Sequence, residues 1–217
     1  MYSYLVFRGN SSNLVEDALL RRPWWKGVVN VPILDSATSD MKKILLHRKD
    51  ESIKEAFEKQ LILKDIKQLK WHFIGRIQSN KIRKIVQNFK YIHSVDSFEK
   101  LQRIANISRE ENKNPLIMLQ VKLSDDPTKG GFNPEFLILK WREIKELKNI
   151  SLTGLMTINP KGLSSKENSE LFKKCRALAD SLQLPDCSMG MSGDWEEAID
   201  AGSTWLRLGS LIFGNRS

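Results

Sequence analysis

The sequence is poor in features that mark several large classes of protein. Only two of its 217 residues, Cys175 and Cys187, are cysteines, so a disulfide framework is not expected. It contains no run of about eighteen uncharged apolar residues, and its first residues lack the basic and apolar sections of a secretory signal. These absences predict a soluble, cytoplasmic protein with reduced thiols and no membrane association.

A glycine-rich dinucleotide fingerprint is also missing. No Gly-x-Gly-x-x-Gly string follows a predicted strand, which removes the main argument for an open dinucleotide-binding sheet. The chain is 41% hydrophobic and long enough to bury one sizeable core. We therefore expect residues 1–217 to form a single domain.

Positive charge is in excess, but unevenly. The net charge is +9, and residues 41–100 hold 15 Lys and Arg against 7 Asp and Glu. A cluster such as Lys81, Arg83, Lys84 and Lys90 is compatible with nucleic-acid binding. A solvated helix face is the favoured interpretation, because the aromatic residues nearby have the pattern of core residues rather than of a stacking platform.

Short β-type runs alternate with helical patterns from residue 71 onward, which is typical of βαβ units around a parallel sheet. Predicted strands lie at 71–75, 91–95, 116–123, 151–158, 187–191 and 204–208. Predicted helices lie at 80–89, 98–110, 134–147 and 167–182, with a further short helix that a capping box of Asp194 and Glu197 begins and Gly202 ends. Without a dinucleotide fingerprint, the order favours an α/β fold of the closed (β/α)8 TIM-barrel type. Residues 1–50 are harder to interpret, with a helix at 12–21 and a strand at 28–34 as expectations.

Two consecutive strand ends carry groups suited to a phosphate. The string SMGMSGD at 188–194 and the string RLGS at 207–210 both lie where a predicted strand stops. Small residues leave backbone N–H groups accessible, and Ser192 and Ser210 add hydroxyl donors. Each string alone also fits a simple turn, whereas the pair with Arg207 between them indicates an anion site.

Four strings in this order and spacing resemble the pyridoxal phosphate homeostasis proteins, small relatives of the N-terminal barrel domain of alanine racemase. They are WHFIGRIQSNK at 71–81, LQV at 119–121 with Lys129-Gly130 downstream, GLMTI at 154–158, and the stretch from Cys187 to Arg216. The resemblance spans about residues 55–216, and its wording is most similar to cyanobacterial members.

The resemblance implies roles for individual residues around bound pyridoxal 5′-phosphate. Arg207 would lie beside the pyridine nitrogen and keep it unprotonated, because a guanidinium cannot accept a proton. Gly209, Ser210 and Ser192 would hold the phosphate. Residues that match the family at strand ends, and are expected near the pocket, are Asn80, Met156 and Lys129. For His72, a satisfied core histidine and a cofactor contact are both open.

The N-terminal region departs from the family. Its usual Val-Ser-Lys string, whose lysine links the cofactor covalently, and the later Phe-Gly-Glu-Asn string are absent, although EAFEK survives at 55–59. Lys26, in Trp25-Lys26-Gly27, is the best candidate for a replacement, with Lys42 as the alternative. For each of them alone, a solvent-facing lysine is the favoured interpretation in a chain with 35 basic residues.

The function that the resemblance implies is cofactor binding in intracellular vitamin B6 and amino-acid homeostasis, without strong catalytic activity. Pyridoxal phosphate is the expected partner, and the chain is expected to be a monomer or weak dimer. The alternative is a degenerate member that has lost covalent cofactor binding and acts as an interaction or nucleic-acid-binding module. A racemase is disfavoured, because such enzymes need a second domain that supplies a tyrosine base, and only three tyrosines are present.

Overall fold

The computed structural model describes residues 53–62, 64 and 70–208, and within them six parallel strands form one sheet in the order β1-β2-β3-β4-β5-β6. The strands are β1 (His72–Phe73), β2 (Tyr91–Val95), β3 (Leu116–Gln120), β4 (Ser151–Met156), β5 (Asp186–Met191) and β6 (Trp205–Arg207). Each strand pairs with the strand next to it along the chain, as right-handed βα units produce in a barrel. The expected helix at 12–21 and strand at 28–34 lie outside the described residues.

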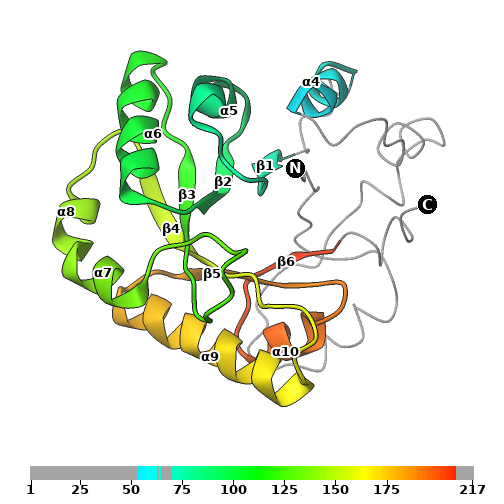
Figure 1. The fold of residues 1–217 in the computed structure, drawn as a ribbon. Helices are drawn as coiled ribbons and strands as arrows, with labels where there is room; N and C mark the ends of the chain where they lie inside the picture. Colours follow the sequence, from blue (N-terminus) through cyan, green and yellow to red (C-terminus); the bar gives the residue numbers. More distant parts are fainter. Residues whose placement is uncertain (1–52, 63, 65–69, 209–217) are drawn as a thin grey trace.

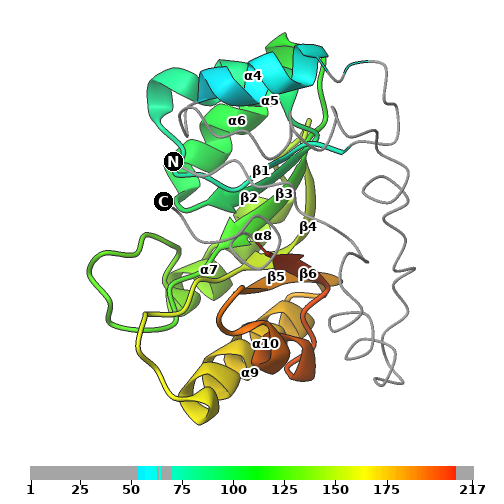
Figure 2. The same cartoon turned by 90° about the vertical axis from the view of Figure 1, so that its right-hand side faces the viewer.

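Helices connect the strands and lie on the outside of the curved sheet (Figure 1). They are α4 (Ile53–Ile62), the short 3-10 helix η1 (Ser79–Lys81), α5 (Ile82–Asn88), α6 (Phe98–Glu110), α7 (Pro134–Leu139), α8 (Trp141–Lys145), α9 (Ser165–Ser181) and α10 (Trp195–Asp200). Figure 2 shows α4, α5 and α6 toward one end of the curved sheet and α9 and α10 toward the other. Strands β2 to β5 are buried along most of their length, as expected for a parallel sheet covered by helices.

Apolar residues that face between strands and helices form the main core. Completely buried members include Ile92 on β2, Leu101 on α6 and Leu155 on β4. Cys175 on α9 and Cys187 on β5 are also buried, and both thiols are free. A hydrogen bond to Cys187, and then burial, raise the pKa of Cys175 well above its usual value, so these residues act as small core side chains.

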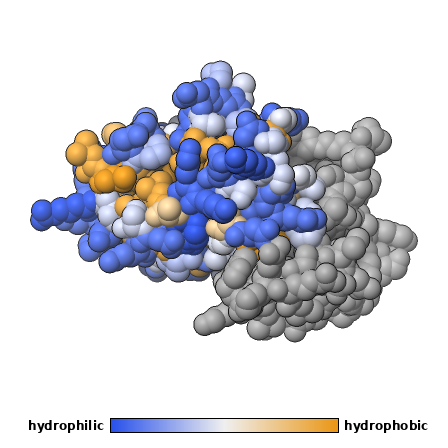
Figure 3. Space-filling view, turned by 90° about the horizontal axis from the view of Figure 1, so that it is seen from below, coloured by the Kyte–Doolittle hydropathy of each residue, from blue (hydrophilic) through white to orange (hydrophobic). Residues whose placement is uncertain are grey.

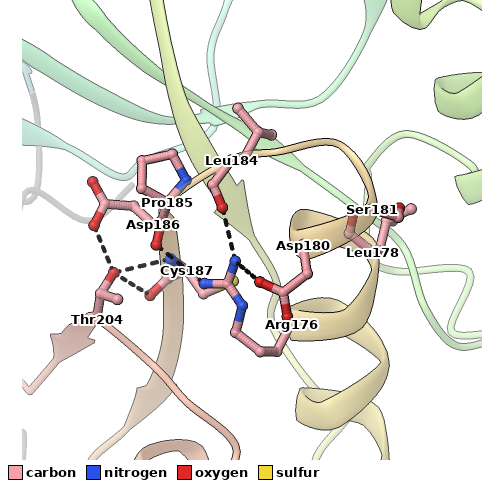
Figure 4. Close-up of polar contacts among 9 residues, drawn as sticks. All are labelled: Arg176, Leu178, Asp180, Ser181, Leu184, Pro185, Asp186, Cys187 and Thr204. Carbon is pink, nitrogen blue, oxygen red and sulfur yellow. Dashed lines mark hydrogen bonds and ion pairs between the residues drawn. The ribbon is translucent and has the colours of Figure 1, made fainter. Parts of the chain in front are cut away.

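A polar network fixes the end of the sheet at which β5 begins (Figure 4). Arg176 on α9 donates to the carbonyl oxygens of Leu184 at 2.7 Å and Pro185 at 3.2 Å. Thr204, just before β6, donates to Asp186 Oδ1 at 2.9 Å and accepts from the backbone N–H of Cys187 at 2.9 Å. These contacts connect α9, β5 and the residue that precedes β6. They lie near the amino-terminal ends of these strands, whereas the predicted site lies at the carboxyl ends.

Two predicted helix boundaries need correction. The predicted helix at 134–147 is two helices, α7 and α8, which break at Lys140 with φ −89° and ψ 1°. The capping box predicted at Asp194 and Glu197 is wrong, because no side chain caps α10 and Asp194 Oδ1 instead accepts from the backbone N–H of Met191 at 2.6 Å. Gly202, with φ +88°, does follow the end of α10 as predicted.

The surface seen from below has an apolar area on the side where α7 lies in Figure 1 (Figure 3). Phe136, Ile138 and Leu139 of α7 are exposed, Leu139 by 80%. Within the described ranges, no helix combines the length and the apolar character that a membrane-spanning segment needs. The same part of the chain holds no cluster of three or more His, Cys, Asp or Glu residues suited to a metal ion.

Candidate cofactor site

The side chain of Arg207, the last residue of β6, is buried and reaches Ser188 within β5 and Thr157 directly after β4. Its Nη1 donates to Ser188 O at 2.6 Å and to Ser188 Oγ at 2.9 Å, and its Nη2 donates to Thr157 O at 2.7 Å. Three of the five N–H donors of the guanidinium are therefore used. Two N–H groups remain for a ligand or for residues outside the described ranges.

The acceptors around this cation are neutral oxygens. Burial lowers the pKa of Arg207 to about 10, and the carboxylate of Asp194 acts in the opposite direction. Arg207 therefore still carries its positive charge near neutral pH. Burial also raises the pKa of Asp194, which lies at the start of α10. A buried cation whose remaining N–H groups have no partner among the described residues suits a ligand with a buried acceptor atom. Neither group can then hydrogen-bond to water, so each needs the other.

A line of buried polar side chains extends from Arg207 across the sheet. His93 on β2 lies 3.0 Å from Ser188 Oγ through Nδ1, and 2.9 Å from His72 Nδ1 through Nε2. His72 also stacks on Tyr91, with ring centroids 4.1 Å apart and planes 9° apart. Burial, followed by the charges of His72 and Arg207, lowers the pKa of His93 well below its usual value.

Met156 is the predicted site residue that lies nearest to this group in the sheet. It ends β4, is completely buried, and is the register partner of Ser188 on β5. Its side chain packs in a small cluster with Ile74, Met118 and Trp205. Met156 and Arg207 each end a strand, and these two strands lie on either side of β5, which carries Ser188.

Ser192 and Lys129 lie in turns that follow strand ends. Ser192 follows β5 directly, in the turn closed by the hydrogen bond between Asp194 and Met191. Lys129 is partly exposed in the loop after β3, which Gln120 holds by donating through Nε2 to Gly130 O at 2.6 Å.

The remaining predicted site residues are either exposed or outside the described ranges. Asn80 is exposed on η1, which follows β1. Gly209, Ser210, Lys26 and the alternative Lys42 lie outside the described residues. Their predicted roles remain predictions.

Sequence reasoning missed four polar groups, on three residues, that the structure places around Arg207. They are the carbonyl of Thr157, the side chain and carbonyl of Ser188, and the ring of His93. A usable signal was present in the string YIHSV at 91–95, where two polar residues interrupt a strand that is otherwise apolar. Buried polar groups need partners, so such residues indicate a hydrogen-bonded network inside the barrel.

Comparisons with known proteins agree with this architecture. The model of the family described as alanine racemase, N-terminal domain, matches residues 48–217. A pyridoxal phosphate homeostasis protein of Synechocystis sp. is 45% identical over 173 residues, which are 77% of this chain and 79% of the relative. A protein of the same name from Pseudomonas aeruginosa is 41% identical and covers 76% of this chain and 72% of its own length.

The chain belongs to the pyridoxal phosphate homeostasis protein family. The family match begins at residue 48 and extends to residue 217. The expected likeness to cyanobacterial members is confirmed by the Synechocystis relative.

Two solved structures resemble the fold of this chain. PipY of Synechococcus elongatus, solved with PLP bound, has a TM-score of 0.71 at 40% identity and covers 75% of this chain and 79% of its own. Alanine racemase of Clostridium difficile has a TM-score of 0.57 at 16% identity, covering 75% of this chain and 43% of its own, and shows the shared fold alone. The predicted TIM-type barrel fold is thereby confirmed, and the described residues contribute six of its parallel strands.

Proposed function

We propose that this chain binds pyridoxal 5′-phosphate at the carboxyl ends of β4, β5 and β6. Its function would be intracellular vitamin B6 and amino-acid homeostasis, without strong catalytic activity. The observation that carries the proposal is the buried Arg207 guanidinium, which has neutral acceptors on one side and two N–H groups without a partner among the described residues. That donor set fits a pyridine nitrogen, which is a neutral acceptor in a flat ring. The relative with PLP bound, 40% identical, supports the same ligand.

Bound pyridoxal phosphate supplies an aldehyde that reacts reversibly with amines, and a ring that withdraws electrons. Arg207 limits the second property, because a guanidinium donates to the ring nitrogen and cannot pass it a proton near neutral pH. An unprotonated ring withdraws electrons less strongly. This chemistry suits a protein that holds the cofactor rather than one that uses it for turnover.

The other predicted residues complete the proposed pocket. Ser192 would donate its hydroxyl to the phosphate, and Gly209 and Ser210 after β6 would donate their backbone N–H groups. Met156 lies at the end of β4 beside Ser188, where it packs near the ring. Asn80 and Lys129 approach from the loops after β1 and β3. Lys26 makes the covalent link, with Lys42 as the alternative.

The nucleic-acid alternative receives no support from the basic region. Arg83, within the cluster that suggested it, pairs with Glu110, the last residue of α6, and with Glu111 directly after it. Part of the local positive charge is therefore neutralised within the protein. The chain is proposed to be cytoplasmic and a monomer or weak dimer, with pyridoxal phosphate as its partner.

The test is to load purified protein with pyridoxal phosphate, remove free cofactor, and record the visible absorption before and after borohydride reduction. A yellow protein with one modified lysine, located at Lys26 by peptide mass spectrometry, is expected. Modification of Lys42 would relocate the link and keep the function. A protein that stays colourless and takes up no cofactor in equilibrium dialysis overturns the proposal.

A further inference from the structure

Four buried side chains from four different strands form one continuous hydrogen-bonded row behind the candidate site. Arg207 on β6 reaches Ser188 Oγ on β5 at 2.9 Å, Ser188 Oγ lies 3.0 Å from His93 Nδ1 on β2, and His93 Nε2 lies 2.9 Å from His72 Nδ1 on β1. All four residues are buried, and Ser188 and His93 are completely so. The row therefore depends on internal partners rather than on solvent.

The chemistry of these groups fixes the direction of the first hydrogen bond and selects one consistent direction for the others. A guanidinium has no acceptor atom, so Ser188 Oγ must accept from Arg207. Among the described residues, His93 Nδ1 is the acceptor within reach of the single hydroxyl hydrogen of Ser188. In the tautomer that uses this acceptor, neutral His93 carries its hydrogen on Nε2 and donates to His72 Nδ1. The hydrogens of this arrangement point in one direction, from Arg207 toward His72.

The surroundings of His93 set its protonation state. Burial and the nearby charges of His72 and Arg207 keep the pKa of His93 well below its usual value, so His93 is neutral near pH 7. The titratable groups packed around the row are His72 on β1, Tyr91 on β2, Cys175 on α9, Asp194 at the start of α10, and Arg207 itself. Among these, Asp194 is the acid that acts on Arg207, and its effect opposes that of burial.

We propose that Ser188, His93 and His72 are positioning residues, which act through hydrogen bonds of fixed direction to hold Arg207 as a donor toward the cofactor ring. The bond from Arg207 to Ser188 Oγ sets the rotation of the guanidinium, and the two histidines keep the Ser188 hydroxyl hydrogen turned away from it. The proposal rests on the proposed function for the identity of the ligand. The row itself is a property of the protein without ligand.

The first test therefore uses the cofactor-free protein. In ¹⁵N NMR spectra of protein labelled at histidine, His93 is expected as the neutral form with hydrogen on Nε2 at pH 6 and pH 7. The guanidinium N–H signals of Arg207 are expected to exchange slowly with water, and at least tenfold faster in Ser188→Ala and His93→Phe. A His93 with hydrogen on Nδ1, or unchanged exchange in both variants, overturns the proposal even if the protein binds no cofactor.

The second test uses protein loaded with pyridoxal phosphate labelled with ¹⁵N in the ring. The affinity for pyridoxal phosphate is expected to fall roughly tenfold to a hundredfold in Ser188→Ala and His93→Phe. Residues that orient a metal ligand by hydrogen bonding have effects of this size on metal affinity, and the row would orient Arg207 in the same way. The ring nitrogen, unprotonated in the wild type, is expected to take up a proton at higher pH in both variants. A merely structural role would not move this titration.

Two further variants separate positioning from stability. His93→Gln retains one acceptor and one donor, and is expected to restore the affinity and the titration at least in part. Ser203→Ala removes another completely buried hydroxyl, whose single hydrogen has the carbonyls of Met189 and Trp205 within reach, and is expected to leave the ring titration unchanged. If Ser203→Ala shifts the titration as Ser188→Ala does, positioning by the row is overturned. If the wild type takes up no cofactor, the proposed function fails, and the measurements on the cofactor-free protein still decide the role of the row.

Discussion

The guanidinium of Arg207 binds two backbone carbonyls that belong to different strands, Thr157 directly after β4 and Ser188 within β5. Neither carbonyl is a feature that a sequence pattern displays, because every residue has one. The string around Arg207 suggested a candidate site residue, whereas its partners depend on the register between β4, β5 and β6. Sequence alone therefore pointed to the cation as a candidate and left its surroundings open.

Replacement of Arg207 by lysine tests this geometry. An ammonium is a point charge and cannot span both carbonyls as the planar guanidinium does. We expect Arg207→Lys to lower the free energy of unfolding by about 1–3 kcal/mol, because at least one buried acceptor loses its donor. We also expect at least tenfold weaker binding of pyridoxal phosphate. Urea denaturation and equilibrium dialysis measure the two effects.

Arg142 provides the matched control. Its side chain is 94% exposed and, among the described residues, pairs with Glu146 alone at 3.5 Å, so Arg142→Lys should leave both quantities within error of the wild type. Equal effects of the two substitutions would show that Arg207 has no special role.

Individual helices and strands were predicted to different accuracy, for physical reasons. The strand at 91–95 and the helix at 98–110 have the predicted bounds. The apolar pattern changes clearly from that of a strand to that of a helix between them, and the Ser97 N-cap marks where the helix begins. The predicted strand at 116–123 stops at Gln120, since Val121 instead bridges Phe132 of the following loop. Apolar spacing also continues across the break at Lys140, so a pattern of side chains cannot reveal that the backbone turns there.

Helix α9 contains a capping box that the sequence displays and that we did not predict. Ser164 accepts from the backbone N–H of Glu167, and the Glu167 carboxylate accepts from the backbone N–H of Ser164 at 2.8 Å. The Ser-x-x-Glu string at 164–167 is the usual signal for this motif. At Asp194, a string of the same type gave the wrong prediction, because the carboxylate bonds backward to Met191 instead.

Ser164→Ala should therefore destabilise the protein by about 1 kcal/mol at pH 7. The Ser164 hydroxyl and backbone lower the pKa of Glu167, and a carboxyl group with a lowered folded-state pKa stabilises the fold above its unfolded pKa of about 4.3. That contribution is lost as the pH falls through the folded-state pKa. The difference between variant and wild type in urea denaturation should accordingly be smaller at pH 3 than at pH 7. Ser165→Ala, one residue further along, is the control and should show neither effect.

The turn from β5 into α10 depends on Gly190. Its φ is +86°, and a Cβ at this position would lie 2.6 Å from Ala198 Cβ on α10. Gly190→Ala should lower the free energy of unfolding by more than about 1 kcal/mol, through both backbone strain and overpacking. Thermal or urea unfolding measures the loss.

Gly193 lies three residues further along and has open space around a built Cβ. Gly193→Ala should be neutral or slightly stabilising, because alanine restricts the unfolded chain. A destabilised Gly193→Ala with an unaffected Gly190→Ala would contradict the described packing of α10 on β5.

Across the whole molecule, the two ends of the parallel strands have different roles. The amino-terminal end of β5 holds the hydrogen bonds of Arg176 and Thr204, which connect a helix to strands. Met156 at the end of β4 and Arg207 at the end of β6 lie at the opposite ends of their strands, and Arg207 reaches back to Ser188 within β5. This division follows from a parallel barrel, in which all strands end at one face and the loops that follow them can vary without disturbing the core.

Cofactor binding should therefore stabilise the whole molecule by linkage. At a free pyridoxal phosphate concentration of 100 times the dissociation constant, the expected gain is about 2.7 kcal/mol, which corresponds to a rise in Tm of roughly 5–10 °C for a chain of this size. Pyridoxine 5′-phosphate has the same ring nitrogen and phosphate and no aldehyde, so it should raise Tm less at equal concentration. The difference between the two ligands reports the covalent link. It should vanish in Lys26→Ala if Lys26 makes that link, and persist if Lys42 does. Equal shifts by both ligands in the wild type would mean that the protein holds its cofactor through Arg207 and the phosphate groups alone.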